Sequence, residues 1–180
     1  MLAAFTAALD ALRKLGVEIV EIDEPNRADF ELSNAAGLLV SRCEAVPFQN
    51  GLLGRAGERS YRPDVREQVA AAGEVRAVDY LEAQRFRGEL VERMAKLLGS
   101  LDALVMPTSR VVAPPSELGD DYLLVLSQNC IPWSFIGFPA VSVPCGLAGG
   151  TGLPAGIEFV AAPFDDGVLV ALVSAVEASL

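Results

Sequence analysis

The feature that most constrains the fold of this chain is a long uncharged run over residues 122–157. A run of this length could cross a membrane if it formed one apolar helix. Prolines and glycines, however, divide it into short pieces; among them are Pro132, Pro139, Pro144, Pro154, Gly137, Gly146, Gly149, Gly150 and Gly152. Pieces this short predict buried strands and turns of a soluble fold, and we expect no contact with a membrane.

The distribution of charge excludes several classes of partner. The net charge is −10, and only one of the 14 basic residues, Arg110, lies beyond residue 100. Binding of nucleic acid or of an anionic membrane surface needs a basic face, so neither partner is expected. With 180 residues, 52% of them apolar, the chain is long enough to bury a core as one domain.

Two residue types limit the available chemistry. The chain contains no His, which excludes His-based nucleophilic triads and imidazole zinc sites. Its three cysteines, Cys43, Cys130 and Cys145, show no CxxC spacing, so neither a disulfide framework nor a metal cluster is expected. We predict no cofactor, a reducing compartment and, because the N-terminus shows no secretory signal, a cytoplasmic location.

Helical and strand patterns alternate along the chain, which predicts an α/β fold. Helices are expected over residues 2–15, 29–48, 77–98 and 121–130, and two more are expected to begin at Pro63 and after Asp165–Asp166. Short strands are expected over residues 17–22, 101–107, 140–144 and 155–161, the last two joined as a hairpin. Residues 51–62 are expected to form a loop rich in Gly and Arg.

None of the reactive side chains belongs to a complete catalytic set. Lys14 and Lys96 lie on the polar sides of predicted helices, so we expect both to be solvated rather than to act as bases. Cys130 and Cys145 lie in apolar surroundings, where buried and inert thiols are the common case. Residues 149–152 are predicted to form a turn, because no Lys-Ser/Thr follows to complete a phosphate loop.

Three further features have both a functional and a structural interpretation. The pairs Asp120–Asp121 and Asp165–Asp166 precede helices, where acids stabilise the positive end of the dipole; we favour this role over a catalytic dyad. Trp133, the sole Trp, is equally suited to a core and to a pocket wall. An arginine cluster could bind a carboxylate substrate, but we favour a solvated loop in which Arg55, Arg59, Arg62 and Arg66 pair with Glu58 and Glu67.

The order of several segments is more specific than any of them alone. The segments are DYLEAQR at residues 79–85, LDALVMPT at 101–108, GFPAVSVPCG at 137–146, GLPAGIEFV at 152–160 and PFD at 163–165. This series resembles the C-terminal part of amidase signature enzymes, and the resemblance extends over essentially the whole chain. It implies a partial amidase-signature fold with a mixed β-sheet flanked by helices, and hydrolysis of amide C–N bonds.

The resemblance also implies a Ser-Ser-Lys triad, in which one Ser attacks the carbonyl and the Lys relays protons through the other Ser. No segment here matches the Gly/Ser-rich signature or its Lys, which belong to the N-terminal part of such enzymes. We therefore expect residues 1–180 to be the incomplete C-terminal part of one amidase domain, inactive alone, whose partners are a small amide substrate and the missing N-terminal part. The alternative is a non-catalytic α/β binding or assembly module derived from an amidase.

The resemblance implies that this chain contributes residues to the substrate pocket. Residues 127–135 resemble the part of the family near the acyl group of the substrate, which makes Ser127, Cys130 and Trp133 candidate pocket residues. Their expected role is shape and apolar contact rather than bond chemistry. A glutamine-type amidotransferase subunit is expected to carry an acidic residue near Ser127; since none is present, a general amidase is favoured.

Overall fold

The computed structural model describes residues 1–56, 61–115 and 121–178. Its elements in chain order are α1 (Leu2–Lys14), α2 (Arg27–Ala56), α3 (Pro63–Gly73), α4 (Ala77–Leu98), β1 (Leu104–Pro107), α5 (Asp121–Ser127), α6 (Ile131–Ile136), β2 (Ala140–Leu147), β3 (Pro154–Val160) and α7 (Asp166–Glu177). Most of the predicted helices and strands are present with small shifts at their ends, so the predicted α/β fold class is confirmed.

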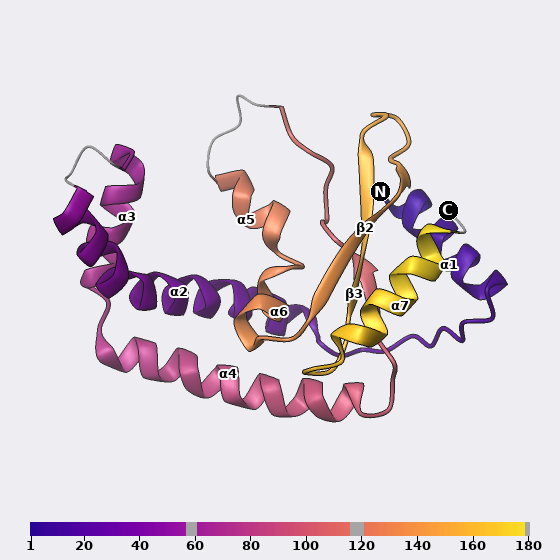
Figure 1. The fold of residues 1–180 in the computed structure, drawn as a ribbon, viewed down its shortest axis with the longest axis horizontal. Coiled ribbons are helices and arrows are strands. Elements are labelled where there is room, and N and C mark those ends of the chain that lie inside the picture. Colours follow the sequence, from indigo (N-terminus) through magenta and orange to yellow (C-terminus); the bar gives the residue numbers. More distant parts are fainter. Residues whose placement is uncertain (57–60, 116–120, 179–180) are drawn as a thin grey trace.

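The three strands form one antiparallel sheet in the order β1-β3-β2 (Figure 1). The hairpin predicted for the last two strands is confirmed, with Val141 opposite Phe159 and Ser142 opposite Glu158. The pairing of β2 with β3 shifts register between Pro144 and Gly146. Gly146 has a φ of 116°, a backbone conformation that residues with a side chain rarely adopt. Strand β3 pairs with both of the other strands and is therefore the centre of the sheet.

Helices α1 and α7 cover one face of the sheet, with α1 packed against β2 and β3 and α7 against β2. Alternate residues of β3, Ile157 and Phe159, point into this layer and are almost fully buried. From the helices, Leu12 and Leu169 complete the cluster. This packing explains why both helices have apolar stripes although they are far apart in the sequence.

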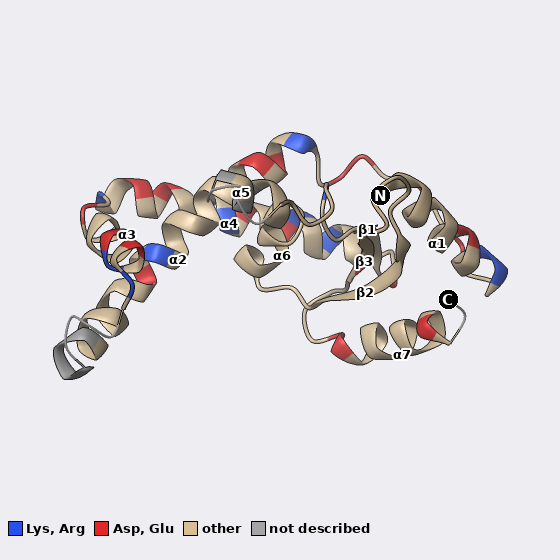
Figure 2. Ribbon diagram, turned by 90° about the horizontal axis from the view of Figure 1, so that it is seen from above, with Lys and Arg blue, Asp and Glu red and all other residues tan. Residues whose placement is uncertain are grey.

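The other face of the sheet packs against α6, α4 and the first half of α2. Leu104 and Val160 from the strands meet Trp133, Leu90 and Met94 in a second cluster. Helices α2 and α4 run side by side, with α3 at their far end (Figure 1). Figure 2 shows that the charged residues gather mainly on α1 to α4, which agrees with the uncharged run that forms α6 and much of the hairpin.

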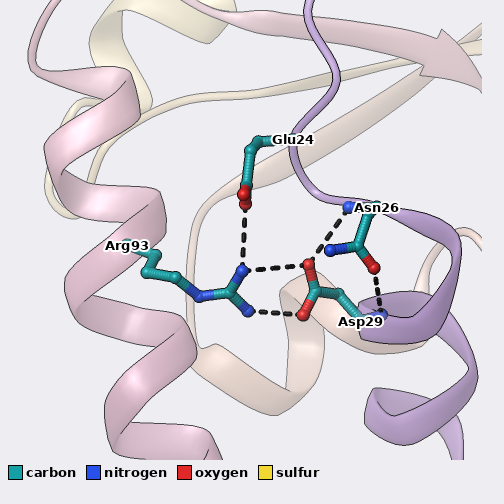
Figure 3. A network of polar contacts seen from close by, with 4 residues as sticks. All are labelled: Glu24, Asn26, Asp29 and Arg93. Carbon is teal, nitrogen blue, oxygen red and sulfur yellow. Dashed lines mark hydrogen bonds and ion pairs between the residues drawn. The ribbon is translucent and has the colours of Figure 1, made fainter.

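A polar network fixes the start of α2 against α4 (Figure 3). The Asn26 side chain accepts the N–H of Asp29 at 3.1 Å, and Asp29 in return accepts the N–H of Asn26 at 3.1 Å, as in a capping box. Asp29 is only 5% exposed and forms an ion pair with Arg93 of α4. Arg93 also reaches Glu24 at 3.0 Å, so one guanidinium joins two segments of the chain.

The structure corrects the prediction in three places. Residues 17–22 form no strand: Val17 and Ile19 pack against the α1 cluster, but no described strand pairs with this segment, so its alternating pattern yields no ladder. Helix α2 continues through Pro47 to Ala56, so the predicted loop begins later than expected. The short helix predicted to reach residue 130 ends at Ser127. It is followed by α6, whose C-cap residue Gly137 has a φ of 77°.

Among the described helices, none combines the length and the apolar character needed to cross a membrane. Both long helices, α2 and α4, carry charged residues along their length. The uncharged run that raised the question is divided between two short helices and the β2–β3 hairpin.

Candidate functional site

A cleft of about 500 Å³ opens where the loop after β1 passes the end of the β2–β3 hairpin. Its walls are mostly apolar; its lining residues from the loop and α5 are Thr108, Ser109, Val111, Val112, Ala113, Pro114 and Leu126. The sheet side adds Ser142, Val143, Pro144, Pro154, Ala155 and Gly156, and Met1 closes one edge. A second cavity of about 420 Å³ shares Val112, Ala113 and Pro114 with the first.

Hydrogen bonds hold the floor of this cleft to the sheet. The N–H of Thr108 donates to the Gly156 carbonyl oxygen at 3.0 Å, which extends the β1–β3 ladder beyond Pro107. The Asn129 side chain donates to the Pro107 carbonyl oxygen at 2.7 Å and thereby ties the α5–α6 connection to the end of β1. The Thr108 and Ser142 hydroxyl oxygens lie 2.5 Å apart, so the polar end of the cleft has a defined geometry.

Gly156 makes that hydroxyl pair possible. A Cβ at this position would lie 2.7 Å from the Thr108 Oγ1, closer than such atoms approach, and 3.1 Å from the Ser142 Oγ, which is a tight contact. Gly156 is therefore required by the packing at the cleft and not by an unusual backbone conformation.

Glu158 lies on the central strand β3, and the residue is 4% exposed. It stands directly opposite Ser142 in the β2–β3 register and opposite Met106 in the β1–β3 register. Burial raises the pKa of its carboxyl to about 7, and a hydrogen bond with the Cys130 thiol offsets part of that rise. Its Oε2 atom is buried and makes no hydrogen bond.

Cys130 connects the α5–α6 turn to this group. Its thiol is 3.3 Å from the Thr108 carbonyl oxygen and also within reach of the Glu158 carboxyl. Burial, followed by the charge of Glu158, raises the pKa of the Cys130 thiol to about 11. A thiol with such a pKa is a poor nucleophile at neutral pH, so the geometry supports a packing role.

The other two predicted pocket residues lie in different surroundings. Ser127 is the last residue of α5 and is partly buried, next to Leu126 of the cleft wall. Trp133 is 1% exposed and sits in the helical core, edge-on to Phe30 with ring centroids 6.2 Å apart. None of the three is among the residues that line the cleft, and Trp133 anchors α6 in the helical core. A pocket role for all three stays a prediction.

Sequence reasoning did not select Glu158, Thr108, Ser142 or Gly156. A usable signal existed for the first, because Glu158 is the only charged residue in residues 122–161. An isolated acid inside an apolar strand must be buried, paired or neutral, and each case is unusual. The other three could not be found from the sequence, since their proximity depends on the register of the three strands.

The lysines and cysteines lie as the sequence predicts. Lys14 and Lys96 are exposed, and neither lines the cleft. Cys145 is buried, and burial raises the pKa of its thiol. Residues 149–152 form the predicted turn, in which Gly150 and Gly152 have φ values of 85° and 66°.

The acidic pairs and the arginine cluster are only partly described. Asp165 is the N-cap residue of α7 but makes no capping hydrogen bond through its side chain, and Asp166 lies in the first turn. Asp121 begins α5, while Asp120 lies outside the described residues. Arg62 pairs with Asp64 at 3.0 Å, since Asp64 follows it closely in the first turn of α3. Arg59 and Glu58, like the side chain of Arg55, lie outside what the structure describes.

No cluster of three metal-ligating side chains occurs in the part of the chain that the structure describes. The polar side chains that line the cleft are instead the hydroxyls of Thr108, Ser109 and Ser142. This set can accept and donate hydrogen bonds, but its nucleophiles have no described base of the Lys or His type beside them. Chemically, the site is suited to binding rather than to bond cleavage.

The sequence profile of the amidase family matches residues 1–170. The chain belongs to the amidase family. The fold agrees with this assignment, since a crystal structure of an amidase with 28% sequence identity superposes with a TM-score of 0.79. That match covers 99% of this chain and 41% of the other, so the predicted partial amidase fold is confirmed.

Relatives of known name are similar over the same portion. One of them, the A subunit of the glutamyl-tRNA(Gln) amidotransferase of Salinispora arenicola (strain CNS-205), is 31% identical over 210 aligned positions, which cover 100% of this chain and 41% of the relative. The corresponding protein of Corynebacterium glutamicum (strain R) is 29% identical, with 99% and 41% covered. The urea amidolyase of K. lactis, at 23% identity and a TM-score of 0.77, shares the fold. This chain spans about 41% of the length of the two amidotransferase subunits and 11% of the urea amidolyase.

Proposed function

We propose that residues 1–180 are the C-terminal part of a single amidase domain that hydrolyses the C–N bond of carboxylic amides. The observation that carries this proposal is the cleft, which offers binding groups but no general base beside a nucleophile among the described residues. The chain contains two lysines, and both are exposed and outside the cleft. The family match and the 41% coverage of the relatives support the same conclusion.

The Ser-Ser-Lys residues of the reaction lie outside this chain in our proposal. Those residues supply the attacking hydroxyl and the proton relay, and backbone amides near them stabilise the oxyanion. This chain contributes one wall of the substrate site, with Ser127 and Cys130 beside the cleft and Trp133 fixing the position of α6. The complete enzyme acts in the cytoplasm on a small amide and needs the N-terminal part as a partner.

The residues near Ser127 bear on the choice between two substrate classes, glutamine-type amides and uncharged amides. The named relatives are amidotransferase subunits, which favours a glutamine-type substrate. Residues 122–157 carry no acid to bind the charged end of glutamine, which favours uncharged aliphatic or aromatic amides. We propose the second class, because an apolar cleft without a charged lining residue would leave the charges of glutamine unpaired.

Amide hydrolysis by the purified chain, with and without its complement, tests the proposal. The complement is the segment of a related amidase that precedes the matched region, supplied as a second polypeptide. We expect no ammonia release from the chain alone, and release from uncharged amides in preference to glutamine when both parts are present.

Hydrolysis by the chain alone that is lost in Lys14→Met or Lys96→Met would contradict the proposal. The alternative, a non-catalytic binding or assembly module, predicts a chain that unfolds cooperatively on its own and never supports turnover with any complement. The two buried clusters on either side of the sheet are the observation that favours this alternative.

A further inference from the structure

The sheet has two outer edges, one along β1 and one along β2. The strand order β1-β3-β2 leaves both without a neighbouring strand among the described residues. An unpaired edge presents N–H and C=O groups to which another extended segment can bond, and natural proteins normally shorten, charge or cover such edges. The backbone groups that each edge presents therefore decide which of them can receive a further strand.

Two hydrogen bonds fix the direction of the backbone groups in the sheet. The N–H of Thr108 donates to the Gly156 carbonyl oxygen at 3.0 Å, so the backbone groups of Gly156 point towards β1. The N–H of Ala161 donates to the Pro139 carbonyl oxygen at 3.1 Å, so those of Ala161 point towards the β2 side. Because the direction alternates along an antiparallel strand, the even-numbered residues of β3 bond to β1 and the odd-numbered residues bond to β2.

The same alternation identifies the free groups of β2. Val141 and Val143 stand opposite odd-numbered residues of β3, so their backbone groups bond to that strand. Ala140, Ser142 and Pro144 then direct theirs away from the sheet. Pro144 agrees with this direction, because a proline is tolerated in a strand where its missing N–H would face outward. Ala140 and Ser142 are exposed, and no described hydrogen bond reaches their backbone groups.

The edge of β1 is closed in a way that the edge of β2 is not. Strand β1 has four residues, and its outward-facing Pro107 has no N–H to offer. The Pro107 carbonyl oxygen already accepts the Asn129 side chain at 2.7 Å. Strand β2 has eight residues, and residues 137–147 carry no charge that would discourage pairing. Of the two edges, β2 is thus the one open to a further strand.

Helix α7 lies over the margin of the sheet at this edge. It packs chiefly against β2, whereas α1 reaches all three strands, and Figure 2 shows α7 on the β2 side of the sheet, away from β1. Val168 and Val170 stand on either side of the buried stripe of α7 and are 40% and 67% exposed. Only Asp166 and Glu177 are charged in this helix. A strand added beside β2 would therefore bury exposed apolar surface on one flank of α7.

We propose that the edge of β2 is the interface with the N-terminal part of the amidase domain, which adds an extended strand beside residues 140–143. The inference rests on the proposed function, in which this chain requires that part. The amidase that superposes with a TM-score of 0.79 holds this fold in 41% of its chain, so the remainder is long enough to supply the strand. The added strand has apolar side chains towards α7, because Val141 and Val143 pack into the cluster on that face.

Amide exchange of the full chain, followed by NMR, tests this inference. In the chain alone, the N–H groups of Val141 and Val143 should be protected, since they bond to β3, and the N–H of Ser142 should exchange rapidly. The complement of the hydrolysis assay is then added. Its binding should slow the exchange of the Ser142 N–H by about tenfold or more, because that group gains a hydrogen bond.

Two substitutions at one position separate the backbone from the side chain. Ser142→Pro removes the outward N–H without breaking a bond to β3, as Pro144 already does two residues further along. It should weaken binding of the complement by about tenfold. Ser142→Ala is the matched control, because it removes the hydroxyl but keeps the N–H, and it should bind like the wild type. If Ser142→Pro does not fold, the exchange of the Ser142 N–H in the wild type decides the question.

A complement that binds while the Ser142 N–H exchanges as in the chain alone would overturn the inference, and so would equal binding to folded Ser142→Pro and Ser142→Ala. Protection of this N–H in the chain alone that grows with protein concentration would also overturn it, since a second copy would then occupy the edge. The readout needs no turnover. Protection by the complement without amide hydrolysis supports the inference and contradicts the proposed function, whereas hydrolysis without protection does the reverse.

Discussion

The replacement of Glu158 by Gln tests most directly how burial governs this site. The neutral amide keeps the size of the carboxyl but cannot ionise. The pKa of the carboxyl rises from 4.5 to about 7 on folding, because the group is buried. Since each unit corresponds to about 1.4 kcal/mol, ionisation of the folded chain costs about 3 kcal/mol.

The sign of the effect follows from which state loses its proton first. Below pH 4.5 the group is protonated in both states and costs nothing. As the pH rises from 4.5 towards 7, the unfolded chain ionises while the folded chain does not, so stability falls. Above about pH 7 both are ionised and the loss is complete. Relative to the wild type, Glu158→Gln should gain about 3 kcal/mol between pH 4.5 and pH 8.

Urea denaturation followed by the fluorescence of Trp133, the only Trp, measures this difference at several pH values. Trp133 is fully buried, so its emission should report global unfolding. The exposed Glu177→Gln serves as control and should follow the wild type. If Glu158→Gln also ran parallel to the wild type between pH 5 and pH 8, the argument from burial would be refuted.

Three further predictions concern neighbouring parts of the fold. Gly156→Ala should destabilise the chain by about 1–3 kcal/mol in urea denaturation, because its Cβ would come within 2.7 Å of a hydroxyl oxygen. Gly149→Ala is the matched control and should not destabilise it, since Gly149 has open space around it. Equal effects of the two substitutions would contradict this prediction. Arg93→Met leaves Asp29 buried without its cation and should cost about 1–3 kcal/mol in the same assay, while no loss would show that the ion pair is dispensable. Cys130 should resist iodoacetamide at pH 8 in the folded chain, since the pKa of its thiol is about 11; rapid labelling detected by peptide mass spectrometry would refute that value.

The local elements could be predicted because their signals are local. The apolar stripe of α7 and the strands on either side of the glycine turn follow from spacing alone. Residues 17–22 could not be assigned correctly, because their alternating pattern is that of a strand and only the absence of a described neighbour shows otherwise. Helix α2 passes Pro47 because tertiary contacts with α3 and α4 outweigh the local disruption by the proline.

The candidate site could be predicted less well than the fold. Cys130 was selected through the family resemblance; its thiol reaches the carbonyl oxygen of Thr108, a lining residue, but its pocket role stays a prediction. Trp133 had two interpretations that composition could not separate, and its burial in the helical core follows from how α6 meets α2. The Thr108–Ser142 pair joins the residue after β1 to a residue of β2, two strands that β3 separates in the sheet, so only the register of the sheet brings them together.

The central proposal is that the Ser-Ser-Lys residues required for amide hydrolysis lie outside the 180-residue chain. Its most direct test is to determine the genomic DNA upstream of the Met1 codon and to translate it in frame. Our account predicts an open frame that encodes a Lys and a Gly/Ser-rich segment, or a neighbouring frame that does so. An in-frame stop codon directly upstream, with no neighbouring frame encoding such a region, would contradict it.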